Sequence, residues 1–257
     1  MATKKERQRQ LAREAYQRRL TRQVRRARRT RQWWISSVSV LLVVGVAVGA
    51  AFLAGAFTPA KPTAAAAVTK TCVYTPSGTA ARKVSVPSRT PDTKATYTAK
   101  ITTNRGTIDI RLLNSAAPCT VNSFVSLADQ GFYNKTPCPR LVTTGFYVLQ
   151  CGDPTGTGSG GPGYEFASEN LKGATYPADT VAMANGGPGT NGSQFFLVYK
   201  NTPPGALAAS YTPFGTITSG LRVLQEIAAK GDNNNNPDGG GNPNESVQIE
   251  SVKITKT

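Results

Sequence analysis

Four cysteines, a glycine-rich run and an Asp/Asn-rich run are the first features of this sequence to examine for chemistry. Histidine is absent from all 257 residues. Without histidine the chain cannot form a Ser-His-Asp triad, a Cys-His pair or an HExxH zinc site. It also lacks the side chain most used for proton transfer near neutral pH. Any reaction that this protein catalyses must therefore proceed without imidazole.

Neither run has the context that a cofactor would require. The run GDPTGTGSGGPG at 152–163 contains a formal GxGxxG, but a proline interrupts it and no βαβ pattern surrounds it. The run DNNNNPDG at 232–239 resembles the start of a Ca²⁺ loop, but Pro237 stands where glycine is required and no glutamate closes the loop. We predict a mobile surface loop at the first run, a solvated turn at the second, and neither a metal site nor a cofactor.

The four cysteines lack the spacing of zinc ligands. In a domain that faces an oxidising compartment we expect disulfides, and four cysteines allow three pairings that sequence alone does not distinguish. Cys138 and Cys151 lie near the two ends of an expected strand–turn–strand unit, which favours that pair. Cys72 with Cys119 would then join the preceding segment to the domain. Reduced, inert thiols are the alternative.

Charge and hydropathy divide the first part of the chain. Residues 1–34 carry 13 of the 30 Lys and Arg residues, and 35–57 contain no charge over 23 positions. A run of that length can cross a bilayer core of about 30 Å, and the preceding basic residues place the N-terminus in the cytoplasm. We predict a single-pass cell-membrane protein with a basic helix, one transmembrane helix and an extracytoplasmic domain. A cleaved signal peptide is the alternative, which the long basic and apolar segments disfavour.

The basic segment 1–34 is expected to contact anionic lipid headgroups, because that is the usual role of such a segment beside a membrane span. Nucleic acid is not expected as a partner, and a separate cytoplasmic partner is a weaker alternative. Residues 58–95 are rich in Ala, Thr, Pro, Lys and Ser and lack apolar periodicity. They predict an extracytoplasmic linker, which leaves 96–257 as the folded domain.

From residue 96 onward, short alternating runs of apolar and polar residues predict β-strands, and two runs with helical periodicity predict helices at 118–130 and 220–230. A hairpin is expected at 96–103 and 106–113. The remaining expected strands are 139–143, 146–151, 179–184, 194–199 and 247–256. These elements sum to one domain of mostly antiparallel strands with two helices.

Four ordered segments resemble the cyclophilin family of peptidyl-prolyl cis–trans isomerases, and the resemblance covers roughly 96–257. They are GTIDIRLL (106–113), PRLVTTGFYVLQCGDPTGTGSGGPGYEF (139–166), MANGGPGTNGSQFFLVY (183–199) and YTPFGTI (211–217). The resemblance implies a mainly β fold, a closed eight-stranded antiparallel β-barrel with two capping α-helices and a ligand groove outside its filled interior. It implies an isomerase that acts on Pro-containing polypeptides and assists their folding. The charged segment and the span lie outside the resemblance; together with them, the chain is expected to be a bacterial, membrane-anchored member of the family.

The resemblance also assigns the site. Arg140 is implied as the catalytic arginine and Gln150 as the glutamine of the groove. Phe195 and Phe196 are neighbours in a strand and must face opposite sides, and the motif favours Phe196 for the groove. Gln194 is expected either to contact the ligand or to serve as a structural hydrogen-bonding group. The implied substrate-binding residues are Phe146, Tyr147, Val148, Ala184, Asn185, Gln194, Phe196, Leu207 and Tyr211.

The segment between Arg140 and Gln150 departs from the family, because it has nine residues where the best-known members have seven. Alignment forward along the chain selects Phe146 for the proline pocket, whereas counting back from Gln150 selects Tyr147 and Val148. All three stay open as candidates at this point.

Two further positions differ from many family members. Tyr211 stands where many have histidine, and a tyrosine there keeps a hydrogen-bonding group on an apolar ring. Ala206 stands where many have the tryptophan that binds cyclosporin, which predicts weak or no cyclosporin binding.

The chemistry implied for Arg140 needs no histidine. Rotation about a peptide bond faces a barrier of about 18–20 kcal/mol from amide resonance, and catalysis requires only that the twisted amide be stabilised. A guanidinium can donate a hydrogen bond to the prolyl nitrogen, whose lone pair returns on twisting, and its charge does not titrate away. The alternative is a non-catalytic chaperone or scaffold that binds Pro-containing segments. The presence of Arg140 favours the enzyme, because binding proline needs the pocket but not the arginine.

Overall fold

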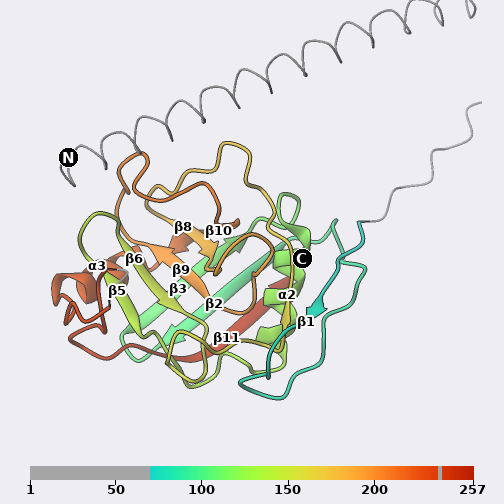
Figure 1. Cartoon of the computed structure of the whole chain (residues 1–257), viewed down its shortest axis with the longest axis horizontal. Helices are drawn as coiled ribbons and strands as arrows, with labels where there is room; N and C mark the ends of the chain where they lie inside the picture. The colour runs from blue at the N-terminus through green and yellow to red at the C-terminus, as the bar shows by residue number, and fades with distance from the viewer. Residues whose placement is uncertain (1–69, 237–238) are drawn as a thin grey trace, which may run out of the picture. The chain divides into compact units, whose positions relative to one another are not determined.

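The computed structural model describes residues 70–236 and 239–257, and all of them belong to one compact unit (Figure 1). The basic helix expected within 1–34 and the membrane span expected at 35–57 lie outside the described residues. Among the residues that the structure describes, neither helix combines the length and the apolar character that crossing a bilayer demands.

The domain is built on one antiparallel sheet of nine strands in the order β4-β11-β2-β3-β10-β8-β9-β6-β5. The strands are β2 (Tyr97–Thr103), β3 (Gly106–Leu112), β4 (Thr136–Pro137), β5 (Arg140–Val142), β6 (Val148–Cys151), β8 (Thr180–Met183), β9 (Phe195–Val198), β10 (Pro213–Ser219) and β11 (Gln248–Lys256). Figure 1 shows β2, β3 and β11 side by side. The two helices and the mainly β character are as predicted.

The expected closed eight-stranded barrel is wrong, because the sheet curls without closing. Its two edge strands, β4 and β5, are separated by only two residues in the chain, so the sheet must bend until its edges approach. No ladder among the described residues joins them. Cys138 donates its N–H to Val247, and Pro139 has no N–H to offer. The result is a curled half-barrel, open between β4 and β5.

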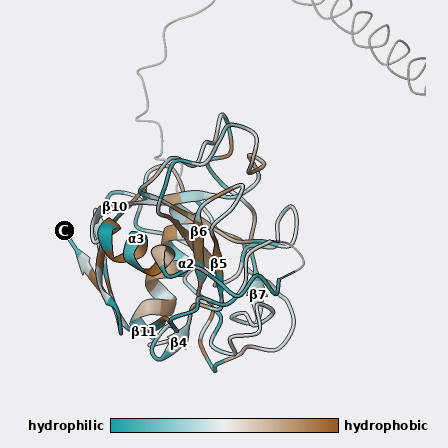
Figure 2. Cartoon of the chain, turned by 90° about the vertical axis from the view of Figure 1, so that its left-hand side faces the viewer, coloured by the Kyte–Doolittle hydropathy of each residue, from teal (hydrophilic) through white to brown (hydrophobic). Residues whose placement is uncertain are grey.

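Helices α2 (Pro118–Asp129) and α3 (Leu221–Ala229) pack against β11 and β3 respectively. Pro118 occupies the first turn of α2, where its missing N–H costs no helical hydrogen bond. The buried face of α2 includes Val121, Phe124 and Leu127, whereas Val125 is half-buried. In Figure 2, α3 is hydrophilic on one side and hydrophobic on the other, as an amphipathic surface helix requires.

The core lies inside the curl and is rich in aromatic rings. Phe195 of β9 is fully buried, and its ring centroid lies 5.5 Å from that of Phe124, 5.7 Å from that of Tyr133 and 6.5 Å from that of Phe214. These edge-to-face pairs bring α2 onto the sheet. The next residue, Phe196, belongs to a separate apolar cluster. The alternation within β9 therefore sends one phenylalanine to the core and one to the outer face, as predicted.

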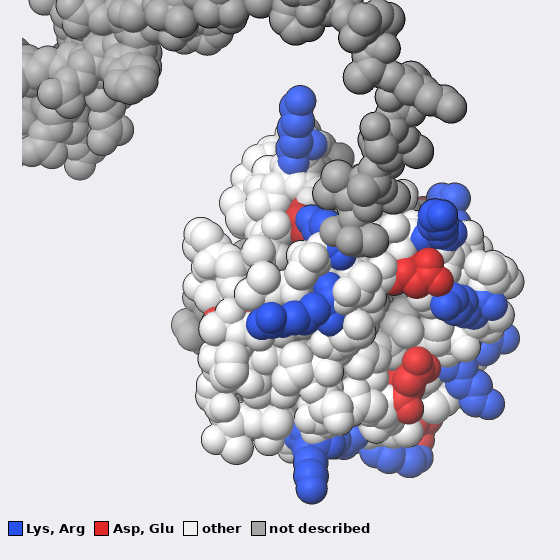
Figure 3. Space-filling view, turned by 90° about the vertical axis from the view of Figure 1, so that its right-hand side faces the viewer, with Lys and Arg blue, Asp and Glu red and all other residues white. Residues whose placement is uncertain are grey.

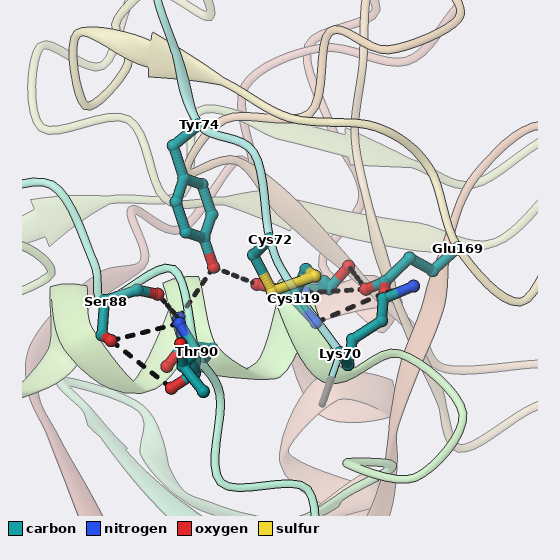
Figure 4. Close-up of a disulfide and its surroundings, with 9 residues drawn as sticks. Lys70, Cys72, Tyr74, Ser88, Thr90, Cys119 and Glu169 are labelled. Carbon is teal, nitrogen blue, oxygen red and sulfur yellow. Dashed lines mark hydrogen bonds and ion pairs between the residues drawn. A yellow bond between two sulfur atoms is a disulfide. The ribbon is translucent and has the colours of Figure 1, made fainter. Parts of the chain in front are cut away.

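The linker expected at 58–95 does not extend to residue 95, because residues 70–95 belong to the folded domain. Strand β1 (Thr75–Pro76) pairs with β7 (Tyr164–Glu165), and a disulfide joins Cys72 to Cys119 of α2. Tyr74 is buried and donates its hydroxyl hydrogen to the carbonyl of Cys119 at 2.9 Å (Figure 4). The segment is held by one short strand pair, a few backbone hydrogen bonds, single side chains and one disulfide, so its sequence shows no periodicity.

Glu169 supports the N-terminus of α2 from another part of the chain. Its carboxylate accepts hydrogen bonds from the backbone N–H groups of Cys119 at 3.3 Å and Thr120 at 2.8 Å, and from the Thr120 hydroxyl at 2.9 Å (Figure 4). A carboxylate at this end of a helix accepts hydrogen bonds from the free N–H groups, and its negative charge interacts favourably with the positive end of the helix dipole. Lys70 forms an ion pair with the same carboxylate at 3.5 Å.

All four cysteines form disulfides, in the pairs Cys72–Cys119 and Cys138–Cys151. This pairing confirms the one that the strand–turn–strand argument favours, and it excludes reduced thiols. The charge of the domain is modest, because residues 35–257 hold 17 Lys and Arg against 12 Asp and Glu. On the face shown in Figure 3, Lys and Arg side chains are dispersed, and several lie beside acidic ones.

Candidate functional site

A groove on the outer face of β5, β6, β8 and β9 contains a cavity of about 420 Å³. Its wall opposite the sheet comes from the irregular segment before β10. The lining residues are Arg140, Phe146, Val148, Gln150, Ala184, Asn185, Phe196, Ala206, Leu207, Ala208 and Tyr211. Arg140, Gln150 and seven of the nine expected substrate-binding residues therefore meet in one cavity.

Tyr147 does not line this cavity, and the structure resolves the ambiguity between Arg140 and Gln150. Because side chains alternate in extended backbone, Phe146 and Val148 face the groove while Tyr147 faces away. The Tyr147 ring lies 4.5 Å from the Lys200 ammonium and borders a separate hollow beside α3. Each of the two alignments thus selects one residue of the groove, whereas Tyr147 lies outside this cavity.

The apolar end of the groove is built around Phe196. Its ring centroid lies 5.5 Å from that of Tyr211 and 6.1 Å from that of Tyr176. The hydroxyl of Tyr176 donates to the carbonyl of Tyr211 at 2.8 Å and accepts its N–H at 3.0 Å. Burial raises the pKa of Tyr176, which keeps that hydroxyl neutral. Sequence analysis missed Tyr176, because nothing in its local pattern shows that it supports a segment 35 residues away.

The polar end of the groove holds the Arg140 guanidinium. Arg140 on β5 lies opposite Gln150 on β6, and its Nη1 donates to the Gln150 Oε1 at 3.4 Å. Its Nε donates to the carbonyl of Gly239 at 3.2 Å, and its Cζ lies 5.9 Å from the centre of the Phe146 ring. Among the described residues that line the cavity, Arg140 alone carries a charge. The cavity therefore places a permanent cation beside an apolar floor.

The carbonyl of Gly239 is held in place because the chain at 239–241 crosses β5 and hydrogen-bonds to its backbone. Leu141 and Gly241 exchange both of their backbone hydrogen bonds, at 2.7 and 3.0 Å. A Cβ at Gly240 would collide with the carbonyl oxygen of Leu141, and this residue has a φ of +72°, so glycine is required there. The predicted solvated turn at 232–239 thus ends in a segment that supports β5. The consecutive glycines 239–241 were the signal that could have indicated it.

Gln194 lies beside the cavity rather than in its wall. Its Oε1 accepts from the Gln150 Nε2 at 2.8 Å, and its Nε2 donates to the carbonyls of Gly158 at 2.9 Å and Gly160 at 3.0 Å. A second cavity of about 380 Å³ adjoins the first and shares Gln150, Ala184 and Asn185 with it. Gln194 lines that cavity, so the structure gives it a structural role and a place beside the groove.

The glycine-rich run 152–163 is a surface loop, as predicted, and hydrogen bonds to one buried carboxylate hold its backbone together. Asp153 is fully buried, and its carboxylate accepts the backbone N–H groups of Thr155 at 2.7 Å, Gly158 at 2.8 Å and Gly160 at 3.0 Å. Burial alone would raise the pKa of Asp153, but these hydrogen bonds outweigh it and hold the pKa below its ordinary 3.8. The buried Asp153 carboxylate therefore fixes the backbone of the loop to which the Gln194 side chain donates its hydrogen bonds.

The comparisons with known proteins agree with this geometry. The family described as "Cyclophilin type peptidyl-prolyl cis-trans isomerase/CLD" matches residues 98–254. The chain belongs to this family. A solved cyclophilin-type isomerase from Cryptosporidium parvum, 30% identical, covers 63% of this chain and 99% of its own with a TM-score of 0.56. A second structure of that protein was determined in the presence of the dipeptide Ala-Pro.

Several curated relatives of this cyclophilin-type chain are mycobacterial proteins, which fits the expected bacterial origin. "Probable peptidyl-prolyl cis-trans isomerase B" of Mycobacterium leprae is 46% identical over 200 residues, covering 71% of this chain and 66% of the relative. Its Mycobacterium tuberculosis counterpart is 44% identical, covering 71% and 63%. The chain thus spans just under two thirds of their lengths. "Peptidyl-prolyl cis-trans isomerase A" of M. tuberculosis is 40% identical, covering 63% of this chain and 93% of the relative.

Proposed function

We propose that this chain is a peptidyl-prolyl cis–trans isomerase, anchored in the cell membrane, that accelerates Xaa-Pro rotation in extracytoplasmic polypeptides. The observation that carries the proposal is the single guanidinium of Arg140 in a cavity of about 420 Å³ whose other end is apolar. A proline ring fits the apolar end, and the arginine stands where the ring nitrogen would lie within reach. Binding alone would need only the apolar end.

The proposed mechanism stabilises the twisted amide relative to the planar one. Phe196, Leu207 and Val148 hold the proline ring, while Gln150 and Asn185 hold the chain on the acyl side. The Arg140 guanidinium donates to the prolyl nitrogen as its lone pair returns, an interaction that the planar amide cannot make. Part of the barrier of about 18–20 kcal/mol is thereby offset in the transition state alone. No nucleophile, base or metal takes part.

The anchored, extracytoplasmic location is supported by residues on both sides of the expected linker. Residues 35–57 are uncharged and follow 13 basic residues, so insertion would leave the N-terminus in the cytoplasm, beside anionic lipid headgroups. The domain carries two buried disulfides, which persist in oxidising compartments. Protease added to intact cells stripped of wall should digest the domain. Protection of the domain until the membrane is permeabilised would contradict this location.

The activity is tested with the full chain purified in detergent and a short peptide that contains Ala-Pro. NMR exchange spectroscopy measures the cis–trans rate directly. Wild type should accelerate exchange, and Arg140→Ala should lose about a hundredfold in rate, the usual effect of removing one transition-state donor. Arg222→Ala is the matched control, because Arg222 is exposed on α3 and pairs with Glu226.

The alternative, a non-catalytic module that binds Pro-containing segments, makes a different prediction in the same experiment. The two extra residues between Arg140 and Gln150 are the observation that favours it. Wild type would then bind the peptide and leave its exchange rate unchanged. Equal rates for wild type and Arg140→Ala would likewise refute the role given to the guanidinium.

A further inference from the structure

The strand that carries Arg140 has little support from the sheet. β5 is three residues long and lies at the edge of the sheet, with β6 as its ladder partner. Three residue pairs join the two strands, and a single bridge, between Leu141 and Gly241, supports the other side. So short an edge strand gains little orientation from pairing alone, because few hydrogen bonds oppose its fraying.

The Cys138–Cys151 disulfide lies at the end of this strand pair where the site residues are. Cys138 precedes Arg140 by two residues, and Cys151 directly follows Gln150. Both cysteines are almost fully buried, at 2% and 1% exposure. The bond therefore closes a covalent ring that contains β5, the connection 143–147 and β6. It lies next to the pair formed by Arg140 and Gln150, at the end that the connection leaves open.

The disulfide matters more in this chain because the connection 143–147 is long. This connection contains the two residues by which the chain exceeds the best-known family members, so the turn itself constrains β5 less than a shorter one would. The chain leaving the other end of β5 passes through Pro139, which has no N–H for a sheet partner. The disulfide is the covalent link that fixes β5 to β6 at this end.

The Cys72–Cys119 disulfide provides an internal comparison. It has the same chemistry and is also buried, at 1% and 7% exposure, but it joins the segment before β1 to the first turn of α2 (Figure 4). None of the four cysteines lines the groove itself, but Cys138 and Cys151 lie within two residues of Arg140 and Gln150, whereas Cys72 and Cys119 have no groove residue so near in the chain. A comparison of the two disulfides can therefore distinguish a contribution to the stability of the fold from a contribution to the geometry of the site.

We propose that the Cys138–Cys151 disulfide is a positioning element for Arg140. It holds the ends of β5 and β6 at one separation, so that the guanidinium stays beside the Gln150 amide and over the Phe146 ring. A displacement of about 1 Å at a reacting centre is enough to lower a rate by about a hundredfold. The inference rests on the proposed isomerase function and deepens it: full activity requires an oxidised chain.

The test compares two double variants of the full chain in detergent with the Ala-Pro peptide. Cys138→Ala with Cys151→Ala should lower the exchange rate at saturating peptide about tenfold, or about 1.4 kcal/mol in the barrier, while the peptide Kd changes less than about twofold. Cys72→Ala with Cys119→Ala should lower the melting temperature and keep the exchange rate. Both are measured well below their melting temperatures.

Two further measurements separate positioning from a general loss of structure. Cys138→Ala with Cys151→Val restores side-chain volume within β6 but not the bond, and it should show the same fall in rate. The Arg140 Nε–H signal should broaden or shift in both Cys138/Cys151 variants and stay unchanged in the Cys72/Cys119 variant.

The inference is overturned if both Cys138/Cys151 variants keep the wild-type rate, or if all three double variants lose rate equally. It is also overturned if neither Cys138/Cys151 variant folds, because the bond then serves the fold as a whole. A wild type that binds the peptide without accelerating exchange is a different result, since it refutes the proposed function itself.

Discussion

Strands β6, β8 and β9 carry apolar residues on both faces, and the two faces are covered in different ways. On the inner face, Leu149, Phe195 and Leu197 have at most 1% of their surface exposed, and Phe124 of α2 packs its ring on Phe195. On the outer face, Phe196 and Val148 are covered by irregular segments that leave a cavity of about 420 Å³. A helix seals one face, while a loop leaves room on the other.

The difference shows how one set of strands can supply both stability and a site. Because successive side chains point to opposite faces, the same strand residues supply both apolar faces. The inner face contributes burial, whereas the outer face keeps unfilled space next to Arg140, so substitutions on the two faces should affect different measurements.

Phe195→Ala should have the largest effect, and it should be on stability. Truncation of a buried phenylalanine costs about 3–5 kcal/mol, because it removes apolar burial and leaves a cavity among three other rings. Urea unfolding of the full chain followed by near-ultraviolet circular dichroism measures this. A loss below about 2 kcal/mol would mean that the inner face is not the stabilising one.

Phe196→Ala should instead act mainly on ligand affinity. The ring forms one wall of the cavity, so its removal should raise the Kd for an Ala-Pro peptide about thirtyfold, or about 2 kcal/mol. Isothermal titration gives this value, and Phe196→Leu should recover part of it. If Phe196→Ala destabilises the fold as much as Phe195→Ala and binds peptide normally, the distinction between the faces fails.

Ala206→Trp tests the rim of the outer face. Wild type should bind cyclosporin only weakly, with a Kd above about 1 µM, and the added indole should tighten binding about tenfold. Ala208→Trp is the matched control, because Ala208 also lines the cavity. Fluorescence titration measures all three, and a submicromolar Kd for wild type would contradict the expectation.

Asp153→Asn should have an effect at the low end of this series, about 1 kcal/mol near pH 7, because a neutral amide accepts the loop's hydrogen bonds less strongly. The pKa of Asp153 in the folded chain lies below 3.8, so its stabilisation is complete above that value and is lost as the pH falls through the folded pKa. The difference in melting temperature between wild type and variant should therefore shrink below about pH 4. A gap in melting temperature that stays constant with pH would argue against this origin.

The regular elements and most of the cavity were predictable from the sequence, because both depend on short-range pattern. Alternation in Phe195–Phe196 predicted the two faces, and the ordered family segments indicated Arg140 and Gln150. Tyr176 and the crossing at Gly240 were not predictable, since each depends on a segment distant in sequence with no periodicity of its own. The unclosed sheet was missed because the closed barrel was taken from the family resemblance, and because β4, with two residues, leaves almost no pattern of its own.

The folded domain begins by residue 70, and this limits how far it can travel. If 35–57 is the anchor that we propose, the 12 residues of 58–69 form the tether. Fully extended they reach about 40 Å, whereas a tether running to residue 95 would reach about 130 Å. The volume open to the domain shrinks about thirtyfold, and its local concentration near the bilayer rises accordingly. With the anchor and the extracytoplasmic location that we propose, so short a tether would favour polypeptides that have just crossed the membrane over those that have already diffused away.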